Sequence, residues 1–239
     1  IGPNAATRLS YGFVLRSRRD EQWSRDVVVR DLLIDGGRDG GRAKNTGGGV
    51  QLGNGWRVEN VHFTNFNYFP VWAYQVAEAR VEHSRFCDRR GEESSAHDAV
   101  GGGQVADLTI GHNDFCGSRP GNAIDLLQGE RSTISHNRTS ALPGAEKGIY
   151  LEGVRATRVM HNRLDRGTIV LQSDVDYGHD RPVWNPRSNT VLHNTVTDSV
   201  GQGISLRYDH SEHGATQGGD NALIGNTVHR TTGPGIVIH

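Results

Sequence analysis

The 239-residue chain has little of what a compact helical domain requires. Hydrophobic residues account for only 34% of it, it contains one Met and two Cys, and no window shows a sustained apolar period of 3.6 residues. No apolar run approaches the roughly 20 residues needed to span a bilayer, and no signal-like segment opens the chain. The 26 basic and 27 acidic residues leave a net charge of −1, so no bulk field draws the chain to nucleic acid or anionic lipid. We therefore expect neither nucleic acid nor a membrane as a partner.

Glycine, in contrast, is abundant, with 32 residues, and it accompanies a repeated phrase. In its strongest copies the phrase reads IGHNDF at 110–115, ISHNRT at 134–139 and VMHNRL at 159–164. Successive copies are 29, 23, 29, 24, 25, 32 and 32 residues apart, a spacing typical of solenoids. The residues that mark the copies are Asp31, Asn60, His83, His112, His136, His161, His193 and Gly225.

A second phrase lies about midway between these copies, as in NAIDL at 122–126, GIYL at 148–151 and GISL at 203–206. Each unit thus consists of short alternating strands and of turns rich in Gly, Asn and Asp. Parallel strands that follow one another without helices, at about 24 residues per unit, pair with their equivalents one coil later, about 4.8 Å away. We expect a single all-β domain over residues 1–239, a right-handed parallel β-helix of about eight coils, truncated or uncapped at both ends.

Stacking explains why like residues recur in neighbouring coils. Asparagines that follow the marker residues are predicted to form a ladder, in which each side-chain amide bonds those above and below. We interpret this ladder and the adjoining column of histidines as structural rather than catalytic or metal-binding. The predicted ladder residues are Asn113, Asn137, Asn162, Asn194 and Asn226.

The two cysteines occupy equivalent places in consecutive repeats. Cys87 follows Phe86 and Cys116 follows Phe115, so the predicted register brings their Cα atoms to about 5 Å, within disulfide range. An exported protein would favour the disulfide, whereas a cytosolic protein would keep two buried thiols. The sequence leaves both alternatives open.

From about residue 26 to the end, the repeat resembles the pectate-lyase-like superfamily of parallel β-helix proteins, which share the pectin lyase fold. This superfamily includes polysaccharide lyases, mannuronan C-5 epimerases, polygalacturonase-type hydrolases and phage tailspike depolymerases. The phrases HDAV at 97–100 and NAIDL at 122–126 are only faintly similar to the Asp-bearing strands of the polygalacturonases, and YDHSEHG at 208–214 is a distant echo of an epimerase motif. The resemblance implies a carbohydrate-binding groove along one strand face, and it transfers no catalytic residue by motif.

The outward positions of the second phrase are the richest in chemistry. Their middle column reads Gln51, Trp72, Gly101, Asp125, Tyr150, Val170, Ser205 and Val237. Aromatic side chains there could stack on sugar rings. The residues that we predict to bind substrate are Trp72, Tyr74, Asp98, Asn122, Gln172, Tyr177, His179 and Asp209.

Three chemistries fit this groove. In a lyase or epimerase, Lys147, Tyr150 and Arg207 would serve as base, acid and carboxylate clamp, with His210 as an alternative base. In a hydrolase, the carboxyls of Asp125 and Glu152, with Cα atoms roughly 8 Å apart, would flank the glycosidic bond. Without catalysis, Lys147 would only form a surface ion pair with Asp98 or Glu152.

Two enlarged loops, at 173–186 and 208–219, leave the same corner in adjacent coils and are expected to touch and wall the groove. Their acids and histidines lack a diagnostic metal-ligand spacing, so we assign no metal ligand and name Ca²⁺ only as a cation to test. The residues expected to meet there are Asp176, Tyr177, His179, Asp180, Asp209, His210 and His213.

Together these patterns predict an exported enzyme, secreted or periplasmic, that modifies a polysaccharide. A lyase or C-5 epimerase acting on a uronic-acid glycan is the first hypothesis. The alternatives are a glycoside hydrolase or fructotransferase on the same scaffold, and a non-catalytic glycan-binding, surface or phage-fibre module. Whether the protein forms a homotrimer is left open by the sequence.

Overall fold

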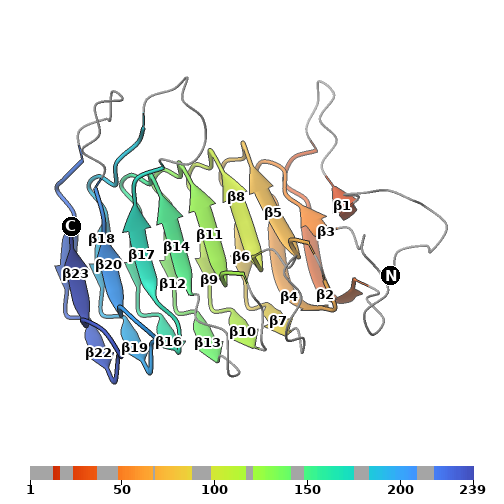
Figure 1. Ribbon diagram of the computed structural model, residues 1–239. Coiled ribbons are helices and arrows are strands. Elements are labelled where there is room, and N and C mark those ends of the chain that lie inside the picture. The colour runs from red at the N-terminus through yellow and green to blue at the C-terminus, as the bar shows by residue number, and fades with distance from the viewer. Residues whose placement is uncertain are drawn as a thin grey trace.

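The computed structural model describes residues 13–16, 24–36, 48–66, 68–87, 98–116, 121–140, 148–174, 183–208 and 218–239. Every regular element within these ranges is a β-strand, and the paired strands are parallel. The strands stack into an elongated solenoid, as the sequence predicted (Figure 1). Among the described residues there is no helix with the length and apolar character needed to cross a membrane.

One side of the solenoid is a nine-stranded sheet to which each coil contributes one strand (Figure 1). Each strand pairs with its equivalent in the next coil, which confirms the predicted stacking. In sheet order the strands are β1 (Phe13–Arg16), β3 (Gly48–Gln51), β5 (Val71–Tyr74), β8 (Val100–Gly103), β11 (Ile124–Leu127), β14 (Ile149–Glu152), β17 (Ile169–Gln172), β20 (Ile204–Leu206) and β23 (Ile236–Ile238).

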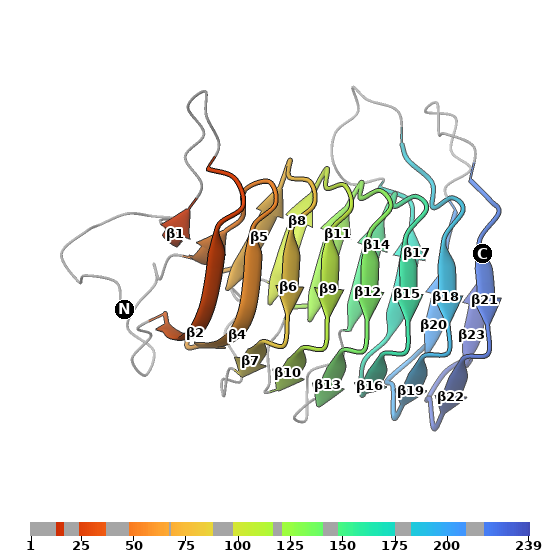
Figure 2. The same cartoon turned by 180° about the vertical axis from the view of Figure 1, so that it is seen from behind.

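The remaining strands form a fourteen-stranded sheet that makes the other sides of the solenoid (Figure 2). Its two halves are joined by β2 (Val28–Asp35) and β4 (Arg57–Thr64), which run through the corner. One half contains β6 (Arg80–Glu82), β9 (Thr109–Gly111), β12 (Thr133–Ser135), β15 (Arg158–Met160), β18 (Thr190–Leu192) and β21 (Ala222–Ile224). The other half contains β7 (Arg85–Cys87), β10 (Asp114–Cys116), β13 (Arg138–Ser140), β16 (Arg163–Asp165), β19 (Thr195–Thr197) and β22 (Thr227–His229).

The core is a stack of aliphatic side chains that lies between the sheets. In β11, Ile124 and Leu126 are fully buried, whereas Asp125 and Leu127 between them point outward and are partly exposed. This alternation follows from the period of two in a strand. Each buried Leu or Ile contributes about 1.5–3 kcal/mol to the stability of the fold. The same alternation therefore fixes which side chains of each strand reach the outer surface.

The asparagine ladder is present at the corner before β10, β13, β16, β19 and β22. The amide of Asn137 donates from Nδ2 to Oδ1 of Asn162 at 3.0 Å, and Asn162 donates likewise to Asn194 at 2.9 Å. Each marker residue before an asparagine has a left-handed backbone, as in His136 with φ 57° and His161 with φ 56°. The strain of that conformation is tolerated because the ladder satisfies the buried backbone groups of the corner.

The histidine column and the cysteines follow the same register. The rings of His83, His112, His136, His161 and His193 are stacked, with neighbouring centroids 4.7 to 5.5 Å apart. Cys87 and Cys116 are Cα partners in β7 and β10, 4.5 Å apart, and form a disulfide. Of the two alternatives, the structure therefore has the disulfide, which links adjacent coils covalently, and not two free thiols.

Candidate functional site

The outer face of the nine-stranded sheet carries the predicted column of outward side chains in register. Asp125 is the Cα partner of Gly101 on one side and of Tyr150 on the other. Tyr150 is in turn the partner of Val170, which pairs with Ser205. A second outward column, two residues further along each strand, contains Leu127, Glu152 and Gln172. These two columns define the surface that we call the outer face.

Two acids at one end of β8 and β11 are linked by an asparagine. The backbone N–H of Asn122 donates to Oδ1 of Asp98 at 2.5 Å, and its side-chain Nδ2 donates to Oδ2 of Asp125 at 2.9 Å. Asn122 itself is buried. One residue thereby orients both carboxylates toward the start of β11, and charge-assisted bonds of this kind are about twice as strong as neutral ones.

Glu152 lies diagonally across from this acid pair. It points away from the core, yet its side chain is only 4% exposed, and its Oε1 accepts a hydrogen bond of 3.0 Å from Nε2 of Gln172. Glu152 pairs with Leu127, two residues beyond Asp125, so the Cα atoms of the two acids are roughly 8 Å apart. A carboxyl that is buried outside the hydrophobic core is costly unless it is bonded, which marks this position as a specialised one.

A second buried carboxyl, which the sequence analysis did not single out, lies one step further along. Asp174 follows β17, is 5% exposed, and accepts hydrogen bonds from the side chain of Gln128 and from the backbone N–H of Trp184. The guanidinium of Arg155 stacks on the Trp184 ring, 4.0 Å from its centroid. The position of Asp174 immediately after a buried strand was the available signal, but Gln128 had none, because it lies 46 residues away in sequence.

Arg207 supplies positive charge to this surface. It follows β20 and is exposed, and its guanidinium donates to Oγ of Ser205 at 3.0 Å and to Oε1 of Gln202 at 3.1 Å. Its backbone N–H donates to the carbonyl of Leu171, which places it beside Gln172. Within the described parts of β3 to β20 and the residue after each strand, Arg207 is the one cation in the two outward columns.

Aromatic rings cover the neighbouring coils of the outer face. The rings of Trp72 and Tyr74 are stacked with centroids 6.0 Å apart, and Phe69 lies 4.4 Å from Trp72. Phe69 occupies the space above Gly101, where a Cβ would collide with its ring. A glycine is required there because the aromatic group packs directly on the sheet. The partly exposed Trp72 and Tyr74 lie in β5, two strands from Asp125 of β11.

Several predicted site residues lie outside the described ranges. They include the proposed base and the residues of the two enlarged loops, so their positions relative to the outer face stay predictions. These residues are Lys147, Asp176, Tyr177, His179, Asp180, Asp209, His210 and His213.

The described residues that flank the two enlarged loops lie in adjacent coils. The backbone N–H of Gly219 donates to the carbonyl of Pro186 at 3.3 Å, and a Cβ on Gly218 would touch both Asn185 and Tyr208. Among the described residues, one group has a spacing that could hold a metal ion, namely Cys87, Asp114 and Cys116. Both of its sulfurs are already bonded to each other, so this group offers no metal centre to the outer face.

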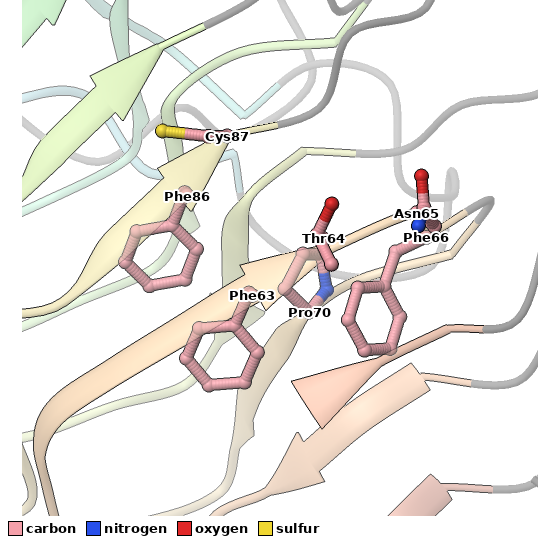
Figure 3. A pocket seen from close by; sticks show the side chains of 7 residues that line it. All are labelled: Phe63, Thr64, Asn65, Phe66, Pro70, Phe86 and Cys87. Atoms are coloured by element: carbon pink, nitrogen blue, oxygen red, sulfur yellow. The ribbon is translucent and has the colours of Figure 1, made fainter. Parts of the chain in front are cut away.

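A small recess lies elsewhere, where β4 and β7 end and β5 begins (Figure 3). Its walls include the stacked rings of Phe63 and Phe86, with centroids 4.9 Å apart, together with Phe66 and Pro70. None of the residues that line it is charged. It offers no acid, base or cation for catalysis, and the outer face therefore remains the candidate site.

Comparison with known proteins places the chain in a family. The model of the right-handed beta helix region matches residues 42–239, and the chain belongs to that family. Among curated proteins, none matches the sequence of this chain.

Solved structures share the fold at low sequence identity. A DFA-IIIase from Arthrobacter chlorophenolicus, in complex with DFA-III, superposes with a TM-score of 0.60 at 16% identity over 89% of this chain and 48% of that one. A pectate lyase from a Bacillus species, in complex with trigalacturonate, gives 0.46 at 12% identity over 85% and 65%. A mannuronan C-5 epimerase A-module from Azotobacter vinelandii gives 0.47 at 13% identity over 89% and 71%. The chain thus spans about half the length of the DFA-IIIase, and the likeness establishes the fold.

Proposed function

We propose that this chain forms the substrate-binding coils of a carbohydrate-active enzyme that cleaves or transfers a glycosidic bond on the outer face. The observation that carries the proposal is the pair of carboxyls on adjacent strands, Asp125 and Glu152. Glycosidases of both stereochemical classes place two carboxyl groups on opposite sides of the scissile bond. The side chains of two residues with Cα atoms roughly 8 Å apart can reach either separation.

The surroundings of the two acids suggest their roles. Glu152 is shielded from bulk water and fixed by Gln172, so it is suited to deliver a proton to the leaving oxygen. Asp125 is more exposed and is oriented by Asn122, and it is suited to attack the anomeric carbon or to activate a water. The aromatic pair of Trp72 and Tyr74 lies two strands from Asp125, where it would stack against the next sugar ring.

The fold likeness to the DFA-IIIase supports a saccharide as the ligand of this chain, because that protein was solved in complex with DFA-III. The disulfide between Cys87 and Cys116 supports export, since such bonds persist in oxidising compartments. The proposal therefore includes secretion of the protein as well as cleavage of a glycan.

A second candidate is a lyase or C-5 epimerase on a uronic-acid glycan, and Arg207 favours it. A lyase requires a cation at the uronate carboxylate, because negative charge develops there in the transition state. Arg207 lies beside Gln172, two strands from Tyr150, and would act as this clamp. Two acids on the outer face, Asp125 and Glu152, with Asp98 bonded to the adjoining Asn122, outnumber this one cation and make the hydrolytic or transfer reaction our first choice.

One experiment distinguishes these functions. The purified chain is incubated with fructans, neutral glucans, pectate, alginate and glycosaminoglycans, and the products are analysed by reducing-end assay, ultraviolet absorbance and mass spectrometry. A hydrolase gives new reducing ends and a transferase gives a rearranged saccharide, and Asp125→Asn and Glu152→Gln should each abolish the product. An unsaturated product that depends on Arg207 would instead establish a lyase. Binding without any product would leave a glycan-binding module and reject the enzyme.

A further inference from the structure

The arginines of the fourteen-stranded sheet and its turns mostly have an acidic partner. Arg57 and Arg80, which are Cα partners in β4 and β6, lie 3.7 and 3.9 Å from Glu59 and Glu82 of their own strands. Further pairs join neighbouring coils, and all of them balance charge locally. These pairs are Arg85 with Asp114, Arg131 with Asp107, Arg187 with Asp220 and Arg230 with Asp198.

Three exposed arginines on β13, β15 and β16 differ from these paired arginines. Arg138, Arg158 and Arg163 form no ion pair with any residue that the structure describes. Arg138 and Arg163 are moreover direct Cα partners on neighbouring strands, so two like charges stand one strand spacing apart. The nearest acid in register, Asp114, interacts with Arg85 on its other side at 3.7 Å.

Such an arrangement does not arise from packing. Like charges placed directly opposite each other in a sheet destabilise it. The chain is close to neutral as a whole, with a net charge of −1, and the acids that flank the two arginines, Asp114 in register with Arg138 and Asp165 on the strand of Arg163, form no ion pair with them. Exposed arginines present planar forks of N–H donors that match carboxylate and sulfate oxygens.

Two stacked histidines extend the group along the corner. His136 and His161 each precede one of these arginines by two residues, are exposed, and have ring centroids 5.1 Å apart. Their ring nitrogens add hydrogen-bond donors and acceptors in the same coils. We call Arg138, Arg158, Arg163, His136 and His161 the basic stripe.

We propose that the basic stripe is a binding surface for an acidic polysaccharide, separate from the outer face. Arg138 and Arg163 lie on adjacent strands about 4.8 Å apart, and Arg158 lies on β15 across the corner from Arg163, so an extended chain that carries carboxylate or sulfate groups can contact the two adjacent coils. The surface would anchor the protein on an anionic glycan while the outer face handles its own ligand. It does not depend on the chemistry proposed for Asp125 and Glu152.

The composition of the stripe favours a glycan over a nucleic acid. Surfaces that bind single-stranded nucleic acid interleave cations with aromatic side chains on which the bases stack. The rings of Trp72 and Tyr74 belong to the nine-stranded sheet, and each histidine ring of the stripe already stacks on both neighbours in its column, so it offers no face to a base. A domain that binds nucleic acid also usually has a strong excess of basic residues, which this chain lacks.

The test compares two double variants with the same change of charge. Arg138→Ser/Arg163→Ser removes the unpaired cations, whereas Arg57→Ser/Arg80→Ser removes two arginines that are likewise direct Cα partners on neighbouring strands but already have acidic partners. Binding is measured on the full chain by biolayer interferometry with immobilised polygalacturonate, dextran sulfate, unmodified dextran and single-stranded DNA. We expect the first variant to bind the two acidic glycans about tenfold more weakly and the second to bind like the wild type.

Further variants and binding conditions distinguish the proposal from its alternatives. Arg138→Lys/Arg163→Lys keeps the charge and should retain most of the affinity, which also controls for folding. Wild-type binding should be lost near 1 M salt, where the Debye length falls to about 3 Å. Preference for polygalacturonate or for dextran sulfate identifies the anionic group. Equal loss in both serine variants, absence of binding to either acidic glycan, or tighter binding of single-stranded DNA would overturn the proposal.

Discussion

Two regions of the same solenoid, a buried corner and the outer face, follow different patterns. At the corner before β10 to β22, successive coils repeat one residue type, and the side chains of the asparagine ladder bond only to one another and to the adjoining backbone. On the outer face, the register is equally strict, but the side chains change in every coil, from Trp72 through Asp125 to Ser205. Of these two regions, the repeated one is structural, and the outward positions at which the residue type changes from coil to coil form the candidate site.

The two regions also differ in the reason why their polar side chains are buried. The ladder asparagine Asn162 is buried because it lies inside a corner that the repeat closes. Glu152 is equally buried, although it points away from the core in a strand whose equivalents in neighbouring coils are Leu127 and Gln172. No stacking requirement calls for a carboxyl there, so its presence is better explained by chemistry than by packing.

The largest effect is expected for Glu152→Gln. The substitution keeps the shape of the side chain and an oxygen for Nε2 of Gln172, but it removes the proton that the leaving group needs. Loss of a general acid lowers turnover by about 10²- to 10⁴-fold. The matched control is His83→Asn, outside the basic stripe, because Asn60 holds the equivalent left-handed position in the adjacent coil with φ 51°. Turnover of each variant on the substrate found in the screen measures the difference, and an active Glu152→Gln enzyme would refute the assignment.

The sequence predicted the solenoid because its signals are local and repeated. The marker residues, from Asp31 to Gly225, all have left-handed backbones, and the stacked cysteines were found from the same spacing. The polar cluster around Asp174 could not be predicted, since Trp184 belongs to a non-repeated loop, and Gln128, which repeats Gln75 and Gln104 in register, lies 46 residues from Asp174. A repeat reveals which residues are vertical neighbours, whereas it contains no information on which non-repeated side chains turn toward each other.

The next effect concerns the ladder and should appear in stability rather than in activity. Asn137→Ala removes the donor to the carbonyl of Ile110 and the acceptor of Asn113, leaving buried polar groups without partners. We expect a loss of about 2–4 kcal/mol in the free energy of unfolding. Asn226→Ala, in a partly exposed coil, should cost only about 1 kcal/mol, because water replaces the lost partners. Urea denaturation followed by circular dichroism measures both, and equal losses would contradict the role of burial.

A smaller effect is expected at the aromatic group. Trp72→Ala should weaken binding of the glycan about tenfold while leaving turnover of bound substrate nearly unchanged, because stacking holds the sugar in ground and transition states alike. Trp72→Phe should restore most of the affinity. Gly101→Ala should act like a mild form of Trp72→Ala, since the added Cβ displaces Phe69, which packs against Trp72. Calorimetric titration with an oligosaccharide gives the affinities, and a variant that lowers only turnover would show that the group is not a binding platform.

The smallest effect is expected when the replacement of an arginine that has an acidic partner is compared with the replacement of one that has none. Arg230 donates to both carboxylate oxygens of Asp198 at 2.6 and 2.7 Å, and this hydrogen bonding lowers the pKa of Asp198 below its usual value. A carboxyl with a lowered pKa in the folded state stabilises the fold above its unfolded-state pKa, and that contribution is lost as the pH falls through the folded-state value. Arg230→Gln should therefore raise the pKa of Asp198 and be less stable than the wild type at neutral pH only, the difference vanishing in acid. Arg138→Gln, which loses no acidic partner, should show no such acid-dependent difference. NMR titration of the Asp198 carboxyl and thermal denaturation at several pH values measure the two variants, and an unchanged pKa of Asp198 in Arg230→Gln would mean that the pair contributes nothing in solution.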